Sequence, residues 1–269
     1  EEVSGDAGLP ALLEAGALSA DGCVIGEPAC DAGRHSVTVA DRGSIWLTLE
    51  ASGKGAHGSR PALGVNAIDR LYEAVGTVRE RLGATTLDID DEVAPIVEES
   101  VEYYSPSMGE AAARDLFRYP SVNLGVLEGG DVVNTVPQSA RAEIDVRLTA
   151  GVHTPDALGG IRECVADCDG GTVADAPWSV GTAEAPESPL VDAVASTAAD
   201  TTGSRIFRRS ATGGGDAKTL RHAGVPTVEF ALGTDTAHAP DEYVPVDALV
   251  DNAVIYARLP AAWQSRVDR

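Results

Sequence analysis

Five histidines limit where this chain could bind a metal ion or activate a water molecule. His238 follows an apolar segment, 227–232, that we expect to be a strand, and α/β proteins place their sites at the carboxyl ends of strands. His57 lies in a glycine-rich segment, 53–61, which would expose it on a loop. A loop histidine is more often a solvated surface residue than a ligand, and the sequence contains no HExxH motif. Histidine placement alone therefore identifies no metal site.

The acidic residues give equally weak signals when each is taken singly. Glu27 stands in a Gly-Glu-Pro segment at the expected end of a short strand, 23–25, because proline cannot donate to a strand ladder. Glu1 and Glu2 form an adjacent pair, but the chain holds 42 acidic residues. Such carboxylates could bind metal or move protons, yet each could equally be a solvated surface group.

A triple-glycine segment, Gly213, Gly214 and Gly215, precedes an expected short helix. It lacks the Lys-Ser/Thr ending of a P-loop, so it is at most weak evidence for anion binding through backbone N–H groups. No GxSxG segment occurs, which argues against a serine hydrolase of the α/β type.

The elements that would position these residues alternate between strand and helix, which favours an α/β fold. Residues 142–148 alternate cleanly, with Arg147 on the polar face, and residues from Asn66 have helical periodicity. Further helices are expected from a Thr154 cap, from Ser188, and over 246–259, where Pro260 should end the last one. Residues 85–118 are expected to be an irregular insertion.

The charge of the chain restricts its partners and suggests its environment. Twenty basic and 42 acidic residues give a net charge of -22 and a pI near 4.4, which disfavours nucleic acid and anionic membranes. Only Lys54 and Lys218 are lysines. Acid excess with few lysines resembles the proteins of salt-in halophilic archaea, with an ordinary acidic mesophilic protein as the alternative. The four cysteines show no zinc-site spacing and suggest no disulfide scaffold, so we expect a cytoplasmic protein. No apolar run reaches the roughly 18 residues that a membrane span needs, so we expect no membrane partner.

Taken in order, six segments resemble one family of zinc metallohydrolases, which includes aminoacylase, acetylornithine deacetylase, succinyl-diaminopimelate desuccinylase and carboxypeptidase G. The segments are Glu1-Glu2 with its following glycines, IGEP, GKGAHGSRP with GVNAI, VNTVP with IDVR, GGGDA, and AHAPDEYV. Each is weak alone, but the six occur in the family's order along essentially the whole chain.

The resemblance implies that two zinc ions, with cobalt as a possible substitute, support hydrolysis of an amide. Glu2, Glu27 and His238 match metal ligands of the family, and Glu1 matches the general base that moves the proton of the attacking water. His57 matches a histidine of the smaller lid domain that donates to the oxyanion, often from the partner subunit of a dimer.

The resemblance also assigns groups that would hold the substrate carboxylate. These are Asn134, Arg147 and the loop of Gly213, Gly214 and Gly215. Arginine suits this role because its planar guanidinium can bind a carboxylate bidentately.

One departure from the family pattern concerns the start of the chain. An early histidine and a bridging aspartate stand tens of residues before the Glu-Glu pair in the family, and this sequence has no such residues. We therefore expect that an N-terminal portion is missing from this sequence, or that the chain is a truncated product.

By this resemblance, the fold is a catalytic α/β domain with a mixed sheet, formed by 1–36 and 184–269, interrupted by a smaller α+β, ferredoxin-like lid at 37–183. The lid would form a homodimer. The expected function in amino-acid metabolism is removal of an acyl group from an N-acyl amino acid. The alternatives are a di- or tripeptidase or carboxypeptidase acting on short peptides, and a non-catalytic remnant that still dimerises.

Overall fold

The computed structural model of the chain describes residues 8–237 and 239–268, which divide into two compact units. One unit contains the described residues up to Arg42, Ile89–Asp115 and those from Gly181 onward, and we call it the catalytic unit only because the family resemblance predicts that role. The lid unit contains Gly43–Asp88 and Leu116–Val180. Each is built on its own sheet with flanking helices, which confirms the predicted fold class. The lid unit lies within the predicted 37–183, whereas residues 89–115 pack with the catalytic unit.

The catalytic unit is built on a mixed sheet whose main strands run in the order β1-β11-β3-β10. β1 pairs in parallel with β11, and β3 in parallel with β10, while β11 and β3 are antiparallel. β2 and β9 pair with β3 outside this path. The strands are β1 (Cys23–Ile25), β2 (Cys30–Asp31), β3 (Arg34–Asp41), β9 (Thr182–Ala183), β10 (Ile206–Ser210) and β11 (Thr227–Glu229).

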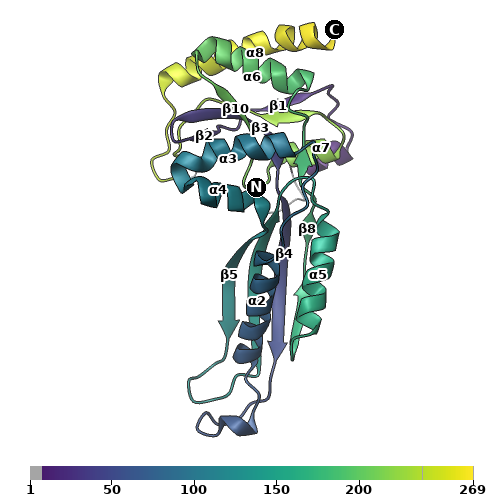
Figure 1. Ribbon diagram of the computed structural model, residues 1–269, viewed down its shortest axis with the longest axis vertical. Coiled ribbons are helices and arrows are strands. Elements are labelled where there is room, and N and C mark those ends of the chain that lie inside the picture. Colours follow the sequence, from purple (N-terminus) through teal and green to yellow (C-terminus); the bar gives the residue numbers. More distant parts are fainter. Residues whose placement is uncertain (1–7, 238, 269) are drawn as a thin grey trace. The chain divides into compact units, whose positions relative to one another are not determined.

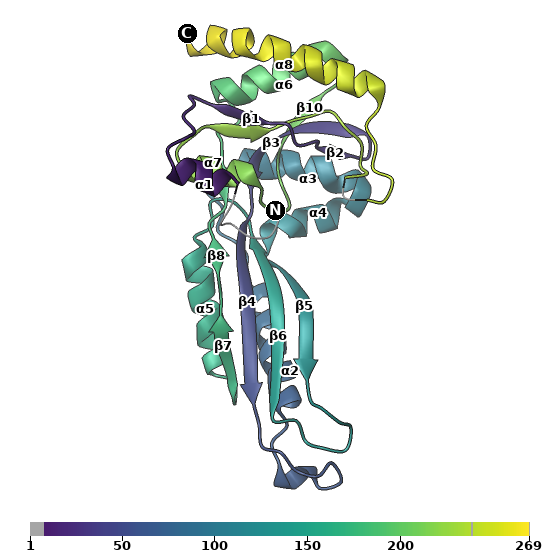
Figure 2. The same cartoon turned by 180° about the vertical axis from the view of Figure 1, so that it is seen from behind.

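Helices lie on both faces of this sheet (Figures 1 and 2). One face carries α6 (Pro189–Thr202), with α8 (Val246–Val267) packed on its outer side, and the other carries α3 (Ala94–Met108) and α7 (Asp216–His222). The short helix α1 (Leu9–Glu14) contacts α7. The side chain of Ser188 accepts a hydrogen bond from Val191 N at the start of α6, as its sequence signal predicts.

The lid unit has the strand and helix order β4-α2-β5-β6-α5-β7, which is ferredoxin-like. Its antiparallel strands lie in the order β5-β6-β4-β7, with the short β8 beside β4. Both α2 and α5 cover one face of this sheet. The elements are β4 (Gly43–Ser52), α2 (Ala67–Gly83), β5 (Ser121–Gly129), β6 (Ser139–Leu148), α5 (Thr154–Ala166), β7 (Gly171–Asp175), β8 (Trp178–Ser179) and a 3-10 turn, η1 (Pro61–Leu63).

Local sequence signals explain the lid elements. In β6, Ala142, Ile144, Val146 and Leu148 are buried, whereas the alternating charged residues are exposed or half-buried. The Asn66 side chain accepts hydrogen bonds from the first amides of α2. These two features are as predicted from the sequence.

Three local predictions are wrong. Residues 85–118 are largely helical, forming α3 and α4 (Glu110–Arg118), because Ile96, Tyr103 and Tyr104 give α3 an apolar face that the catalytic unit buries. The N-cap of α5 is His153, and the Thr154 hydroxyl instead donates to Ser179 O. Pro260 does not end α8: it is exposed, so the carbonyl that it leaves without a helical partner can be hydrated.

In the described part of the chain, no helix combines the length and apolar character needed to cross a membrane.

Candidate functional site

Glu27 lies where an α/β protein is expected to place a site. It follows β1 directly and is exposed. The last residue of β1, Ile25, pairs with the last residue of β11, Glu229, so Glu27 stands at the carboxyl ends of a parallel strand pair. The charge of Glu27 also helps to raise the pKa of Glu229, which makes the two carboxylates electrostatic neighbours.

The remaining predicted metal and proton-transfer residues cannot be placed beside Glu27. Glu1, Glu2 and His238 lie outside the described residues. Within residues 8–237 and 239–268, no group of three His, Cys, Asp or Glu side chains could hold a metal ion. Carboxylates and an imidazole are suitable donors for zinc. The zinc site at Glu2, Glu27 and His238 stays a prediction, of which the structure locates one member.

The glycine loop connects β10 to α7 and is fixed by the backbone of β3. Arg42 N, just beyond β3, donates to Gly213 O at 3.1 Å. At Gly215, an added Cβ would lie 2.8 Å from Oε1 of Glu229. The loop therefore passes directly over the Glu229 carboxylate, and this close approach favours glycine at position 215.

A buried charged network lies behind this loop, and sequence reasoning missed it. Arg221 of α7 donates from Nη1 to Oδ2 of Asp41 at 2.6 Å, and the two side chains are 4% and 0% exposed. Its other donors reach Thr38 O and Thr227 O, so the guanidinium joins α7 to β3 and β11. Burial raises the pKa of Asp41, and the charge of Arg221 opposes that shift.

Glu229 is the most strongly perturbed acid of this region. Burial, aided by the nearby charge of Asp41, raises the pKa of Glu229 from 4.5 to about 7, against the opposing charges of Arg221 and Arg209. A carboxyl that titrates near neutrality beside a predicted ligand is characteristic of functional sites. The signal was present in the sequence, since Glu229 is an acid inside an otherwise apolar strand segment, 227–232.

The lid unit brings two of the predicted residues together. His57 pairs with Thr135 in an isolated bridge, and Gly58 N donates to Asn134 O at 2.6 Å. The Nδ1 atom of His57 accepts from Ser59 N at 3.2 Å and lies 2.8 Å from the Ser59 hydroxyl. With Nδ1 as the acceptor, a neutral imidazole carries its proton on Nε2, which is then the available donor.

Arg147 lies on β6 of the lid unit, on the face that α2 and α5 do not cover. Its Nε atom donates to both carboxylate oxygens of Asp145, at 2.8 and 3.0 Å. Asp145 therefore fixes the direction of the guanidinium. Any substrate carboxylate at Arg147 would share the guanidinium with Asp145.

Comparison with known proteins shows which families and enzymes this chain is similar to. Residues 39–169 match the M20 dimer family, described as the peptidase dimerisation domain. The chain is 31% identical to succinyl-diaminopimelate desuccinylase of Acidiphilium cryptum, over 93% of this chain and 60% of that protein. It is 24% identical to acetylornithine deacetylase of Edwardsiella ictaluri, over 96% of this chain and 61% of that one. The chain is thus similar to a peptidase dimerisation domain over 39–169 and to these two amide hydrolases over nearly its whole length.

Solved structures show that the chain has the M20 peptidase fold. An M20 family metallo-carboxypeptidase from Sulfolobus solfataricus superposes with a TM-score of 0.74 at 18% identity, covering 93% of this chain and 65% of that one. The aminopeptidase PepT from Bacillus cereus gives a TM-score of 0.62 at 19% identity, covering 94% of this chain and 61% of that one. The chain spans about 60% of the length of the curated relatives that it matches.

Proposed function

We propose that this protein is a metal-dependent amide hydrolase that removes an acyl group from an N-acyl amino acid. The alignment with the desuccinylase of Acidiphilium cryptum carries the proposal, because it extends over 93% of this chain and includes both units. The position of Glu27, at the carboxyl ends of β1 and β11, supports it independently.

In this proposal, Glu2, Glu27 and His238 hold zinc, and two ions occupy the complete site. When bound, zinc would supply a water whose pKa is lowered to about 7 and Lewis-acid chemistry at the amide carbonyl. Glu1 takes a proton from the attacking water and then delivers it to the nitrogen of the leaving amine. Adjacent glutamates can divide the two roles because side chains at consecutive positions point in different directions.

His57 donates from Nε2 to the oxygen that becomes negatively charged as the amide is attacked. Its hydrogen bonds to Ser59 support this role, because they hold Nδ1 as the acceptor and leave the Nε2 proton for the substrate. Asn134, whose backbone is joined to Gly58, would lie in the same substrate-binding region.

Each unit contributes a proposed carboxylate-binding group: Arg147 in the lid unit, and the backbone N–H groups of the Gly213–Gly215 loop in the catalytic unit. Asp145 holds the Arg147 guanidinium at a fixed angle, which reduces the entropy lost when a substrate binds.

Peptide hydrolysis is the second candidate, because M20 peptidases share this fold. A panel of N-succinyl and N-acetyl amino acids, dipeptides and tripeptides distinguishes the two, assayed on the full-length protein with zinc in molar KCl. We expect the highest kcat/KM for an N-acyl amino acid. Preference for a peptide would favour the second candidate, and hydrolysis of neither would favour a non-catalytic dimerising protein.

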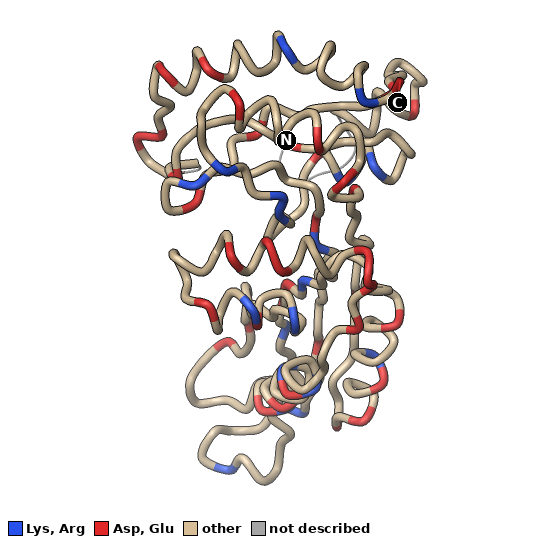
Figure 3. Tube along the Cα trace, turned by 45° about the horizontal axis from the view of Figure 1, so that its top comes forward, with Lys and Arg blue, Asp and Glu red and all other residues tan. Residues whose placement is uncertain are grey.

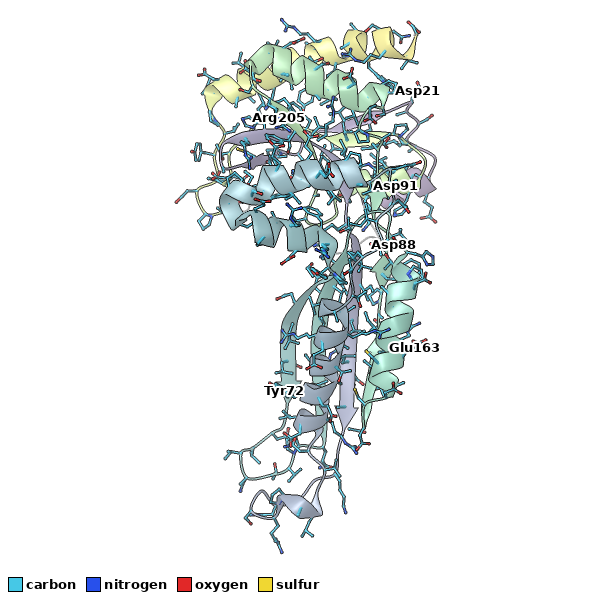
Figure 4. The ribbon with its side chains drawn as sticks, in the orientation of Figure 1. Asp21, Tyr72, Asp88, Asp91, Glu163 and Arg205 are labelled. Atoms are coloured by element: carbon cyan, nitrogen blue, oxygen red, sulfur yellow. The ribbon has the colours of Figure 1, made fainter. Side chains whose placement is uncertain are left out.

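We further propose a homodimer formed through the lid unit. β5 lies at one end of the lid sheet, and its Leu127 side chain is 55% exposed. Tyr72 of α2, labelled in Figure 4, is 77% exposed. A second copy could extend the sheet at this edge and cover these apolar groups.

Light scattering in molar salt tests the dimer. Leu127→Lys should lower the fraction of dimer at micromolar concentration, whereas Leu249→Lys, on an exposed position of α8, should not. A monomeric wild-type protein would contradict the proposal.

We also propose that the protein works at high salt, which its excess of acidic residues supports. Acidic positions outnumber basic ones over both units (Figure 3). In molar salt the Debye length falls to about 3 Å, so repulsion among these carboxylates is screened.

A further inference from the structure

Lys218 is buried in the catalytic unit, although lysine is the residue type that this chain uses least among its charged residues. It lies on α7 and is 8% exposed. Its ammonium donates from Nζ to Arg42 O at 2.8 Å. The other lysine, Lys54, is exposed on a lid loop.

The backbone of Arg42 connects this lysine to the glycine loop. Arg42 N donates to Gly213 O at 3.1 Å, while Arg42 O accepts from Lys218 Nζ at 2.8 Å. Lys218 N also donates to Gly215 O at 3.1 Å. The Gly213 end of the loop is thereby tied through Arg42 to the Lys218 side chain, and the Gly215 end to the backbone of the same residue.

The middle of the loop lies against the same side chain. A Cβ added at Gly214 would lie 3.3 Å from Cδ and 3.5 Å from Nζ of Lys218. The lysine stem thus runs beneath Gly214 and supports it from inside the unit. An arginine would place a planar fork in this space, which is bulkier than an ammonium.

Burying a lysine is costly, because its long side chain loses rotamer freedom and its charge loses water. A methionine would fill a similar volume without the charge. The network behind the loop is already held by Arg221, which bonds to β3 and β11. The charge of Lys218 also opposes the raised pKa of Asp41, while its Nζ bond to Arg42 O and its stem beneath Gly214 support the loop.

We propose that Lys218 is a positioning residue that sets the backbone of Gly213–Gly215 for recognition of the substrate carboxylate. This inference rests on the proposed function, in which that loop binds the carboxylate. Lys218 acts through the loop and need not touch the substrate.

The test compares an N-acyl amino acid with its carboxamide, which lacks the carboxylate charge, in the full-length zinc-loaded protein. We expect Lys218→Met to raise KM for the acid about tenfold, with kcat and the KM for the carboxamide nearly unchanged. We define the selectivity ratio as KM for the carboxamide divided by KM for the acid. Lys218→Arg should give a ratio between those of the wild type and Lys218→Met. Arg162→Met removes one exposed cation from α5 of the lid unit and should change neither ratio nor KM.

Each outcome bears on the inference. If Lys218→Met raises KM equally for the acid and the carboxamide, or leaves the ratio of the two KM values unchanged, the role of Lys218 is overturned while the proposed function stays intact. A wild-type protein that hydrolyses the acid and the carboxamide equally well would instead remove the carboxylate site itself. If Lys218→Met does not fold, Lys218→Arg with an unaltered thermal midpoint decides: a lowered ratio supports the inference, and an unaltered ratio overturns it.

Discussion

In the lid unit, the sheet separates apolar from charged side chains. Ile45, Leu47 and Leu49 of β4 are fully buried, as are the alternate residues of β6. The charged residues between them form pairs on the uncovered face, such as Arg141 with Glu143 and Arg147 with Asp145. Exposed or half-exposed pairs of this kind contribute little to stability.

The catalytic unit instead buries charged groups where its strands end. Asp41 ends β3, Glu229 ends β11, and Arg221 and Lys218 reach inward from α7. Each such group costs free energy to desolvate. Replacing a buried ion pair by apolar residues of similar size often leaves the protein no less stable. The comparison indicates that the lid unit is organised for packing, and that the catalytic unit retains costly polar groups close to Glu27 and the glycine loop.

The largest expected effect concerns the glutamate pair of the catalytic side. Glu1→Gln should lower kcat by about 10²–10⁴-fold with zinc content unchanged, because the amide cannot accept the water's proton. Glu2→Gln should lose zinc first and activity as a consequence. Both are measured in the full-length protein by steady-state kinetics and metal analysis; equal zinc loss in both variants would contradict the division of roles.

The buried ion pair is the next most sensitive point. Arg221→Met should lower the free energy of unfolding by about 3–5 kcal/mol, because it leaves Asp41 charged and unpaired in the interior. Urea denaturation measures the effect. Adding Asp41→Leu should recover part of the loss, and only part, since Thr38 O and Thr227 O stay without their donor.

A lid substitution should affect the reaction without affecting the metal. His57→Ala is expected to lower kcat by about 10²–10³-fold, as for other losses of an oxyanion donor, with full zinc content. Kinetics and metal analysis on the same sample check this. Zinc loss would instead indicate that His57 is a metal ligand. The metal site would then not be confined to the catalytic unit.

Glu229 should make stability depend on pH. Its pKa of about 7 in the folded protein exceeds the ordinary 4.5, so the folded state binds the proton more tightly between these values. The free energy of unfolding therefore falls as pH rises from about 4.5 to 7, by at most about 3 kcal/mol from this group. In metal-free buffer, Glu229→Gln should flatten the fall; an identical pH profile would show that Glu229 is not responsible.

The smallest effect is expected on the lid surface. Arg147→Met should change the free energy of unfolding by less than about 1 kcal/mol, because its pair with Asp145 is partly exposed. Urea denaturation beside Arg221→Met provides the direct comparison. Similar losses in the two variants would show that burial does not separate the two ion pairs.

Much of the lid could be predicted from the sequence, since its signals are local. Alternation in β6 and the Asn66 cap each follow from neighbouring residues. The helices α3 and α4 were missed because contacts with residues far away in sequence stabilise them. One example in α3 is Tyr104, whose hydroxyl donates to Ser210 O. The extension of α8 through Pro260 likewise depends on exposure, which the sequence pattern does not contain.

The candidate site was predictable only where residues match a family motif. Such motifs directed attention to Glu27, His57 and Asn134. They did not indicate Asp41 or Arg221, because the pairing of these residues depends on the approach of α7 to β3, far away in sequence. Glu229 was also missed, although an acid within an apolar strand segment is itself a signal.

The separation of paired strands along the chain has a consequence for how the protein folds. β5 and β6 are neighbours in sequence and pair along most of their length, whereas β3 pairs with β10 only after the whole lid has been made, with His35 opposite Ile206. Closing the long loop between β3 and β10 costs more chain entropy than closing a hairpin, and such contacts slow folding. During synthesis, the lid hairpin can therefore form early, and the sheet that carries Glu27 and Glu229 is completed only when β10 and β11 emerge.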